Sequence, residues 1–234
     1  MTQATDNAKD PWPWGVPRPP SGDELPYEDD EPMESELHIH QMDMTLDYAR
    51  HLLAERDAYV IGNMALYYSA LQAKNLDFKA PDIMVFLDVE RRVRKSWVVW
   101  EEDGKRPDLV IELLSETTRN NDLGRKKNVY ERLGVRDYFA YDPFTADLWG
   151  WTLEGGRYLP LTPDRDGRLE CASLGVKVGV VEGLYAGVRG PWLRFFGPDG
   201  EVIPTHAEAE ARRAEAAERE LVELRRLLAE RSGS

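Results

Sequence analysis

The sequence predicts an α/β (α+β) fold in which short buried strands alternate with helices. Two apolar runs, at residues 81–89 and 107–114, each open with Pro-Asp and have the length of strands that are covered on both faces. A helical pattern over residues 122–133 follows, and a third apolar strand is expected at residues 137–141. This order of strand, helix and strand is typical of α/β domains.

Segments on either side of this centre are predicted from periodicity and turn residues. Apolar residues four apart predict a helix over residues 41–56. β-Branched and aromatic residues favour strands over residues 58–68 and 96–100, although the first of these is also compatible with a helix. Residues 147–190 carry several turn sequences and predict antiparallel strands, and a last hairpin is expected at residues 193–203.

The helix at residues 122–133 has a signal at each end. Asp122 is expected to be its N-cap, because a carboxylate there accepts the free backbone N–H groups of the first turn. Gly134 is expected to end it, because glycine readily adopts the left-handed conformation that follows many helices.

The C-terminal segment predicts an amphipathic, coiled-coil-like helix. Thr205 and Glu208 fit a capping box directly after Pro204. Five apolar residues then alternate spacings of three and four, as in the seam of a coiled coil: Ala214, Ala217, Leu221, Leu224 and Leu228. Because the seam is short and begins with alanine, the sequence is compatible both with self-association through it and with a monomeric helix.

Composition divides the 234 residues into four parts. Residues 1–36 are acidic, rich in proline and poor in aliphatic residues, which predicts a disordered tail. Residues 37–190 are expected to form the main domain, 191–204 a β-hairpin linker, and 205–234 the terminal helix.

Several classes of protein are excluded by composition. The single cysteine, Cys171, excludes an internal disulfide framework and a cysteine-rich zinc site. No apolar run approaches the roughly 18 residues of a membrane span, and the N-terminus has no apolar secretory signal. The sequence therefore predicts a cytoplasmic protein without a membrane partner.

The net charge of -13 argues against tight non-specific binding to DNA. The acid is unevenly placed, however, since residues 1–36 contain ten acidic residues and only two basic ones. The rest of the chain is closer to neutral and has basic clusters at residues 91–95, 105–106 and 125–127.

Two carboxylates in the apolar runs are the candidates for chemistry. Glu112 lies inside its strand, between Ile111 and Leu113, where a charge is costly to bury unless it is paired or bound to a cation. Asp82 begins the other run, and Lys126 lies on the helix that follows Glu112. Carboxylates on adjacent strands can hold a hard divalent cation such as Mg²⁺, and a lysine can stabilise the transition state.

These residue types suit phosphodiester hydrolysis and do not suit acyl transfer. No G-x-S-x-G motif is present, and no histidine lies near Cys171 in the sequence. By spacing alone Asp82 is equally compatible with capping a turn, as is Asp108, and Lys126 with a solvated helix face between Arg125 and Lys127.

Residues 58–190 and the terminal helix resemble a known family. The sequences APDIMVFLDV at 80–89, SWVVWEED at 96–103 and RPDLVIELLSETTRNNDLGRKKNVYERLGVRDYFAYDP at 106–143 carry the resemblance. They are similar to the Uma-two family of restriction-endonuclease-like proteins, which belongs to the PD-(D/E)XK nuclease superfamily.

This resemblance implies a restriction-endonuclease-like fold, a mixed central sheet flanked by helices. It implies Asp82 and Glu112 as the motif acids that hold Mg²⁺ or Mn²⁺, together with the backbone carbonyl of Leu113. The superfamily lysine usually stands two residues after the glutamate, where this chain has Leu114. The resemblance implies that the lysine has moved to the next helix, and it alone selects Lys126 over Lys127.

Three further acids are weaker site candidates. The superfamily often has an acid on its first helix, for which Asp47 and Glu55 are available, and Asp108 opens the strand of Glu112 on the same face. The pair His38 and His40 is compatible with metal binding on a strand edge or with an incidental role. Trp97 and Trp100 are compatible with base stacking or with core packing.

Two functions remain open at this point. The first is a Mg²⁺-dependent DNA endonuclease with Asp82, Glu112 and Lys126 as its catalytic residues. The alternative is a catalytically inactive nuclease fold that serves as an interaction module. In either case the sequence allows a homodimer through the nuclease domain or the C-terminal helix.

Overall fold

The structure is a computed structural model, and it describes residues 20–21, 35–69, 78–115 and 118–232. The tail expected at residues 1–36 lies almost entirely outside the described residues. The helices and strands follow one another as α1 (Glu36–Leu52), β1 (Ala58–Ile61), β2 (Leu66–Tyr67), β3 (Ile83–Leu87), β4 (Trp97–Val98), η2 (Val99–Glu101), β5 (Leu109–Leu113), α3 (Arg119–Asn121), η3 (Asp122–Lys126), α4 (Lys127–Leu133), β6 (Asp137–Asp142), β7 (Asp147–Glu154), β8 (Arg157–Pro160), β9 (Leu169–Cys171), β10 (Val176–Tyr185), β11 (Val188–Phe196) and α5 (His206–Ser232).

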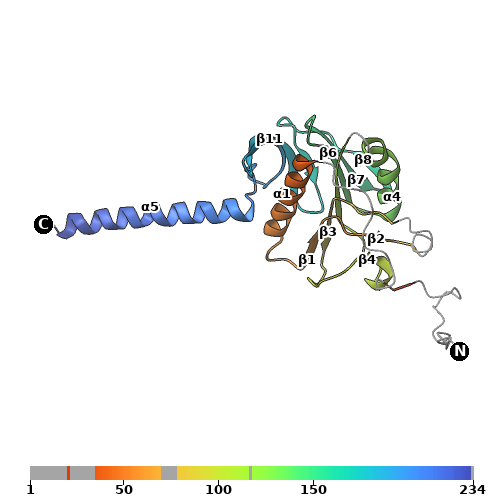
Figure 1. Cartoon of the computed structure of the whole chain (residues 1–234), viewed down its shortest axis with the longest axis horizontal. Coiled ribbons are helices and arrows are strands. Elements are labelled where there is room, and N and C mark those ends of the chain that lie inside the picture. The colour runs from red at the N-terminus through yellow and green to blue at the C-terminus, as the bar shows by residue number, and fades with distance from the viewer. Residues whose placement is uncertain (1–19, 22–34, 70–77, 116–117, 233–234) are drawn as a thin grey trace, which may run out of the picture.

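A six-stranded mixed sheet forms the centre of the domain, in the order β1-β3-β5-β6-β7-β8. Only β5 and β6 are parallel, and the helical segment from α3 to α4 makes the crossover between them. All other neighbours in this sheet are antiparallel. The predicted α/β class with a mixed central sheet and flanking helices is therefore confirmed (Figure 1).

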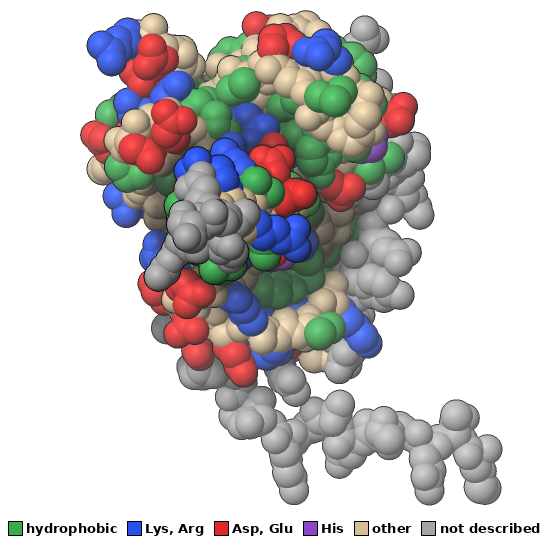
Figure 2. Space-filling view, turned by 90° about the vertical axis from the view of Figure 1, so that its left-hand side faces the viewer, with side chains coloured by type: hydrophobic (Ala, Val, Ile, Leu, Met, Phe, Trp, Pro, Cys, Tyr) green, Lys and Arg blue, Asp and Glu red, His purple; other side chains and the backbone are tan. Residues whose placement is uncertain are grey.

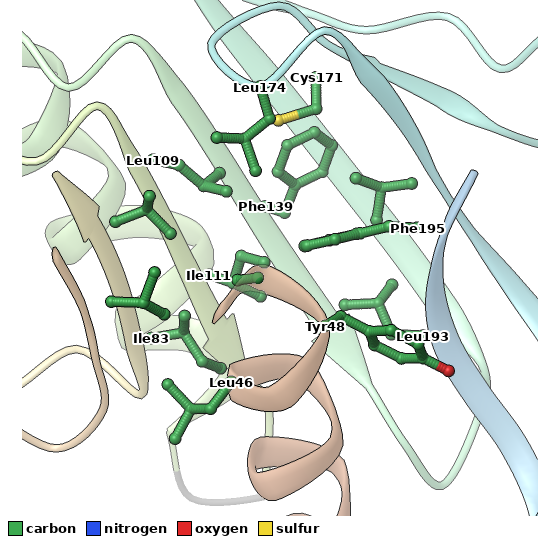
Figure 3. Close-up of a cluster of buried hydrophobic side chains, with 14 of the residues drawn as sticks. Leu46, Tyr48, Ile83, Leu109, Ile111, Phe139, Cys171, Leu174, Leu193 and Phe195 are labelled. Atoms are coloured by element: carbon green, nitrogen blue, oxygen red, sulfur yellow. The ribbon is translucent and has the colours of Figure 1, made fainter. Parts of the chain in front are cut away.

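Different elements cover the two faces of this sheet. On one face α1 and a second, three-stranded sheet of β9, β10 and β11 enclose an apolar core. Figure 3 shows Ile83 and Ile111 of the central sheet meeting Leu46 of α1 and Phe195 of β11 there. On the other face α4 and the two-stranded sheet of β2 and β4 cover a second core that is rich in aromatic residues.

The three predicted central strands are present, β3 and β5 within the predicted ranges and β6 one residue longer than predicted, and their side chains alternate between the two cores. Ile111 packs toward α1, whereas Val110 and Leu114 pack toward α4. Glu112 is two residues from both Val110 and Leu114, so its side chain points to the same face of the sheet. The strand therefore directs the Glu112 carboxylate toward α4.

The strand expected over residues 58–68 is divided into β1 and β2 around Gly62. A Cβ atom at this glycine would lie 2.7 Å from the backbone oxygen of Asp82. The close approach of the two backbones requires glycine at this position, and the chain turns away from the central sheet after it. In the neighbouring segment Trp97 is fully buried and stacks on Phe86 at 3.6 Å between ring centroids, which is a core role.

The helices predicted at residues 41–56 and 122–133 both begin earlier than expected, and the first also ends earlier, at Leu52. The first starts at Glu36, because Ser35 acts as the N-cap and its hydroxyl accepts the backbone N–H of His38. The prediction that Asp122 is an N-cap is wrong, because the chain is already helical from Arg119. The predicted end is confirmed, since Gly134 is left-handed with φ of 86°.

The region after β8 is antiparallel, as predicted, and is dominated by the long hairpin of β10 and β11. The expected linker boundary at residue 190 falls within β11, which runs on to Phe196. The hairpin expected at residues 193–203 is represented by a turn at residues 197–200 and an isolated bridge between Phe196 and Val202.

The predicted C-terminal helix is present as α5 and projects away from the domain (Figure 1). Its predicted capping box is confirmed, since the Thr205 hydroxyl accepts the N–H of Glu208 at 3.0 Å and the Glu208 carboxylate accepts the N–H of Thr205 at 2.9 Å. Among the described helices, none has the length and apolar character needed to cross a membrane.

Candidate active site

Asp82 and Glu112 lie side by side at one end of the β3–β5 pair. The antiparallel register sets Ile83 opposite Ile111, which brings the residue before β3 next to Glu112. The backbone N–H of Asp82 points at Glu112 Oε2, 3.5 Å away, and the N–H of Leu113 donates to Asp82 Oδ2 at 2.6 Å. The strand register alone therefore places the two carboxylates together.

The carboxylate of Glu112 is only 1% exposed and is held by two side chains of the helical crossover. The Tyr130 hydroxyl donates to Glu112 Oε1 at 2.6 Å, and Lys126 Nζ donates to Glu112 Oε2 at 3.3 Å. Because β5 directs Glu112 toward α4, both donors reach it from the helix that directly follows the strand.

A π-helical turn, η3, shapes this part of the crossover. Lys126 at its end forms ion pairs with Glu112 and, at 2.9 Å, with Asp122 Oδ1 at its beginning. Asp122 is 1% exposed, so a second buried carboxylate shares the same lysine. Turns of this wide kind occur frequently at functional sites, since the inserted residue redirects side chains.

The next residue, Lys127, points elsewhere. Its Nζ lies 4.9 Å from the centroid of the Trp151 ring on β7. The helix phase thus brings Lys126, and not Lys127, to the two strand carboxylates.

One further ionisable group comes from α1. His38 Nε2 lies 3.2 Å from Asp82 Oδ1, and the Ser35 cap fixes the helical turn that carries His38. The two α1 acids considered from the sequence lie elsewhere. Asp47 accepts the backbone N–H of His206 at 2.8 Å, and Glu55 is exposed beyond the end of α1.

Burial and charge perturb the titration of this cluster. Burial raises the pKa of the Glu112 carboxyl to about 8, in spite of the lowering effect of Lys126, and nearby Asp82 and Asp122 raise it further. Burial likewise raises the pKa of Asp122. Burial alone would lower the pKa of Lys126, but the Glu112 and Asp122 carboxylates raise it overall, so this side chain stays protonated.

The profile of the Uma2 family, described as "Putative restriction endonuclease", matches residues 32–181. The chain belongs to the Uma2 family. The resemblance noted in the sequence is thereby confirmed.

No curated protein matches the chain at a significant level. Among solved structures, the chain is similar to a crystal structure of a putative nuclease belonging to DUF820 from Anabaena variabilis ATCC 29413. The two are 15% identical, with a TM-score of 0.46, over 61% of this chain and 76% of that chain.

The donor set of this Uma2 protein fits a divalent cation. Within the described residues, no group of three or more His, Cys, Asp or Glu side chains has the arrangement of a complete metal site. Mg²⁺ does not need one, because it commonly binds through one or two carboxylates and keeps several waters. Two buried carboxylates, Glu112 and Asp122, pair with one ammonium group, and Asp82 lies beside Glu112, so a cation would offset the remaining negative charge.

Asp108, the other strand-opening acid, lies at the opposite end of the β3–β5 pair. Its Oδ2 accepts the N–H of Leu87 at 2.7 Å and pairs with Lys105 at 2.8 Å. It is therefore separated from Asp82 and Glu112 by the length of the strands, and its contacts are those of a strand cap.

Sequence reasoning missed two members of the cluster, Asp122 and His38. The helical pattern in the sequence begins at Asp122, which predicts a helix cap at this residue. The sequence is compatible with His38 and His40 as a pair on a strand edge, whereas both lie on α1, where His40 Nε2 is 3.5 Å from Glu36 Oε1. For His38 a signal was present, since Ser35 in front of it is a favourable N-cap.

Proposed function

We propose that this Uma2 protein is a metal-dependent endonuclease that hydrolyses DNA phosphodiester bonds, with Asp82, Glu112 and Lys126 as its catalytic residues. The observation that carries the proposal is the cluster in which the buried carboxylates of Glu112 and Asp122 pair with a single lysine, Lys126, and Asp82 lies beside Glu112. Such a cluster is costly in a fold that has no cation to bind. Family membership supports the nuclease class.

In this proposal Asp82 and Glu112 hold Mg²⁺ or Mn²⁺, with the backbone carbonyl of Leu113 as a further ligand. A divalent cation at this position supplies positive charge for the phosphoryl oxygens and lowers the pKa of water. Oxygen donors of this kind suit hard cations.

Lys126 acts as a hydrogen-bond donor and a fixed positive charge, and not as a general base. The raised pKa of its ammonium group, which results from Glu112 and Asp122 in spite of burial, keeps the proton on Nζ. A protonated lysine beside the reacting phosphate can orient the attacking water and stabilise the charge of the pentavalent transition state.

Two neighbours position the acids. Burial raises the pKa of the Tyr130 hydroxyl well above its usual range, so Tyr130 remains a donor and fixes Glu112 Oε1. His38 contacts Asp82 Oδ1, while the N–H of Leu113 holds the other oxygen. Together these contacts orient both carboxylates from three different elements, which is the preorganisation that catalysis requires.

Cleavage of supercoiled plasmid DNA by the purified protein tests this function. We expect nicked or linear DNA with Mg²⁺ or Mn²⁺, no cleavage in EDTA, and no cleavage by Glu112→Gln under any condition. The Glu112→Gln variant keeps the shape of the side chain and still accepts the Tyr130 hydroxyl. Absence of cleavage by the wild-type protein with every divalent metal tested would favour the inactive interaction module instead.

A further inference from the structure

The contacts that the described part of α5 makes with the domain lie at the base of the helix. Arg194 of β11 pairs with Glu208 at 2.8 Å, and Asp47 of α1 accepts the N–H of His206. Among the residues whose burial is described, Ala209 is the last buried one, and every residue from 210 to 228 is exposed. Figure 1 shows the helix extending far beyond the domain, and Figure 2 views it from its free end, with apolar and charged side chains around it.

One stripe of this exposed helix is apolar. It consists of the five residues at alternating spacings of three and four, called here the α5 seam: Ala214, Ala217, Leu221, Leu224 and Leu228. Its three leucines are 48%, 52% and 62% exposed, in chain order. A single solvated helix gains nothing from aligned leucines, whereas a partner that covers the stripe would bury them favourably.

The charges that flank the α5 seam identify the partner. The α5 seam follows a heptad, in which Ala214, Leu221 and Leu228 take position a and Ala217 and Leu224 take position d. Four charged residues then occupy the flanking positions g and e. In chain order these are Arg213 (g), Glu218 (e), Glu220 (g) and Arg225 (e). In a parallel pair of identical helices, each g residue faces the next e residue of the other chain.

This arrangement makes every flanking contact attractive. Arg213 would face Glu218 of the partner subunit, and Glu220 would face Arg225 of the partner subunit. In an antiparallel pair, g residues face g residues of the partner and e residues face e residues. A register that pairs Arg213 with Glu220 of the partner subunit then leaves Glu218 too far along the helix to pair with Arg225 of the partner subunit. The charge pattern therefore selects both a second copy of this chain and its direction.

Ion pairs within the helix are consistent with this selection. Glu223 and Arg226 lie at the outer positions c and f, and they pair with each other at 2.7 Å. Among the described side chains, Glu218, Glu220 and Arg225 have no ion-pair partner within the chain. Arg213, the fourth flanking residue, lies 2.5 Å from Glu210 in the same helix, so Glu218, Glu220 and Arg225 are the flanking charges that remain available to a partner.

We propose that α5 is a homodimerisation element that forms a parallel, in-register, two-stranded coiled coil with α5 of a second copy. The dimer has two-fold symmetry, and because each helix begins at its domain, both domains lie at the same end of the coiled coil. This inference does not depend on the catalytic proposal, since none of the α5 seam residues takes part in the candidate active site.

Sedimentation of the 234-residue chain at high micromolar concentration is the first test. We expect a dimer for the wild type, and at least about 100-fold weaker dimerisation for Leu221→Lys, since each dimer loses two buried leucines. The neighbouring Val222→Lys is the matched control, because Val222 is 59% exposed at the outer position b. A monomeric wild type, or a Leu221→Lys variant that dimerises as well as Val222→Lys, overturns the proposal.

Charge exchange tests the pairing partner. Glu220→Arg and Arg225→Glu, each alone, place like charges opposite each other and should weaken the dimer about tenfold. A mixture of the two single variants restores opposite charges in both contacts, so we expect a heterodimer of wild-type strength. Unchanged affinity in both single variants, or no recovery in the mixture, rules out the proposed charge register.

Orientation is tested by Leu228→Cys under mild oxidation. Parallel, in-register helices bring the two introduced thiols within reach of a disulfide, whereas an antiparallel pair sets this position opposite the first half of the partner's seam. The native Cys171 is buried and does not interfere. We expect covalent dimer from the Leu228→Cys protein and none from the wild type, and a Leu228→Cys protein that dimerises without cross-linking contradicts the parallel arrangement.

Discussion

The two ends of the β3–β5 strand pair begin with the same dipeptide and differ in their surroundings. Pro81-Asp82 precedes β3, and Pro107-Asp108 precedes β5. Because the strands are antiparallel, each aspartate reaches the far end of the other strand. Asp82 accepts the N–H of Leu113 at 2.6 Å, and Asp108 accepts the N–H of Leu87 at 2.7 Å.

What separates the two ends is the set of neighbouring elements. At the Asp82 end, β5 contributes Glu112, η3 contributes Asp122 and Lys126, and α1 contributes His38. At the Asp108 end, the nearby ionisable partner among the described residues is Lys105, within the same loop. The Pro-Asp motif is therefore a strand cap at both ends, and the potential for chemistry comes from the groups that the tertiary fold adds at one of them.

The largest effect on cleavage is expected for Lys126, which the crossover helix places at the Asp82 end of the strand pair. Lys126→Ala should reduce plasmid cleavage by at least about 100-fold, as expected for the loss of a preorganised charge at the transition state. Mn²⁺ binding should persist, because lysine does not ligate the ion. Lys127→Ala is the control, since Lys127 lies against Trp151, and it should at most weaken DNA binding in a salt-dependent way.

Full activity of both lysine variants would contradict the assignment of Lys126. The reverse pattern, with Lys127 essential and Lys126 silent, would mean that the π-helical turn places the wrong residue at Glu112. Single-turnover cleavage at several salt concentrations separates these outcomes.

A second prediction concerns stabilisation by metal. Mg²⁺ or Mn²⁺ at about 100 times its dissociation constant should stabilise the wild-type fold by roughly 2.7 kcal/mol, since the ion binds the folded protein selectively. We expect the same increase in melting temperature for Asp108→Asn and none for Glu112→Gln. Equal metal-induced shifts in all three proteins would show that the ion binds elsewhere.

A third prediction concerns pH in the absence of metal. The folded pKa of Glu112, raised to about 8 chiefly by burial, exceeds its ordinary value of 4.5. The folded state therefore holds a proton that the unfolded state releases over this range, and stability should fall as pH rises from about 5 to about 8. Asp122, whose pKa is also raised by burial, acts in the same direction.

Urea unfolding at a series of pH values in EDTA measures this effect. Glu112→Gln should flatten the decline, because glutamine has no proton to lose, whereas Asp108→Asn should leave the slope unchanged. A wild-type stability that rises over this pH range would contradict the costly burial of the cluster.

The smallest expected effect lies at the Asp108 end. Asp108→Asn keeps an acceptor for the N–H of Leu87 and loses a partly exposed ion pair with Lys105, so it should cost about 1 kcal/mol or less. Cleavage should remain within about twofold of the wild type. A large loss of activity in this variant would mean that the two ends are functionally coupled.

The sequence predicted the parts of this site that depend on local pattern. The apolar runs before and around Glu112 identified β3 and β5, because burial on both faces leaves an unbroken apolar stretch. The resemblance to Uma2 sequences selected Lys126. The spacing of residues alone did not rank Asp82 above Asp108, because both follow proline and both cap a strand.

What the sequence did not predict depends on tertiary contacts. Asp122 joins the cluster because the chain is helical from Arg119 and widens into a π-helical turn, and no local pattern marks that turn. His38 reaches Asp82 across 44 positions of the sequence, and only the packing of α1 against the sheet brings the two together. The earlier start of α1 depended on a single cap, Ser35, outside the apolar period.

Titration of Mn²⁺ into the wild type, Asp82→Asn and Asp108→Asn, followed by calorimetry, tests the central claim most directly. The claim is that two identical strand caps differ because only one end of the β3–β5 pair gathers the ligands of a divalent cation. We predict equal Mn²⁺ affinity for the wild type and Asp108→Asn, and at least about tenfold weaker binding for Asp82→Asn. Equal affinity in all three proteins, or loss of binding in Asp108→Asn alone, would contradict it.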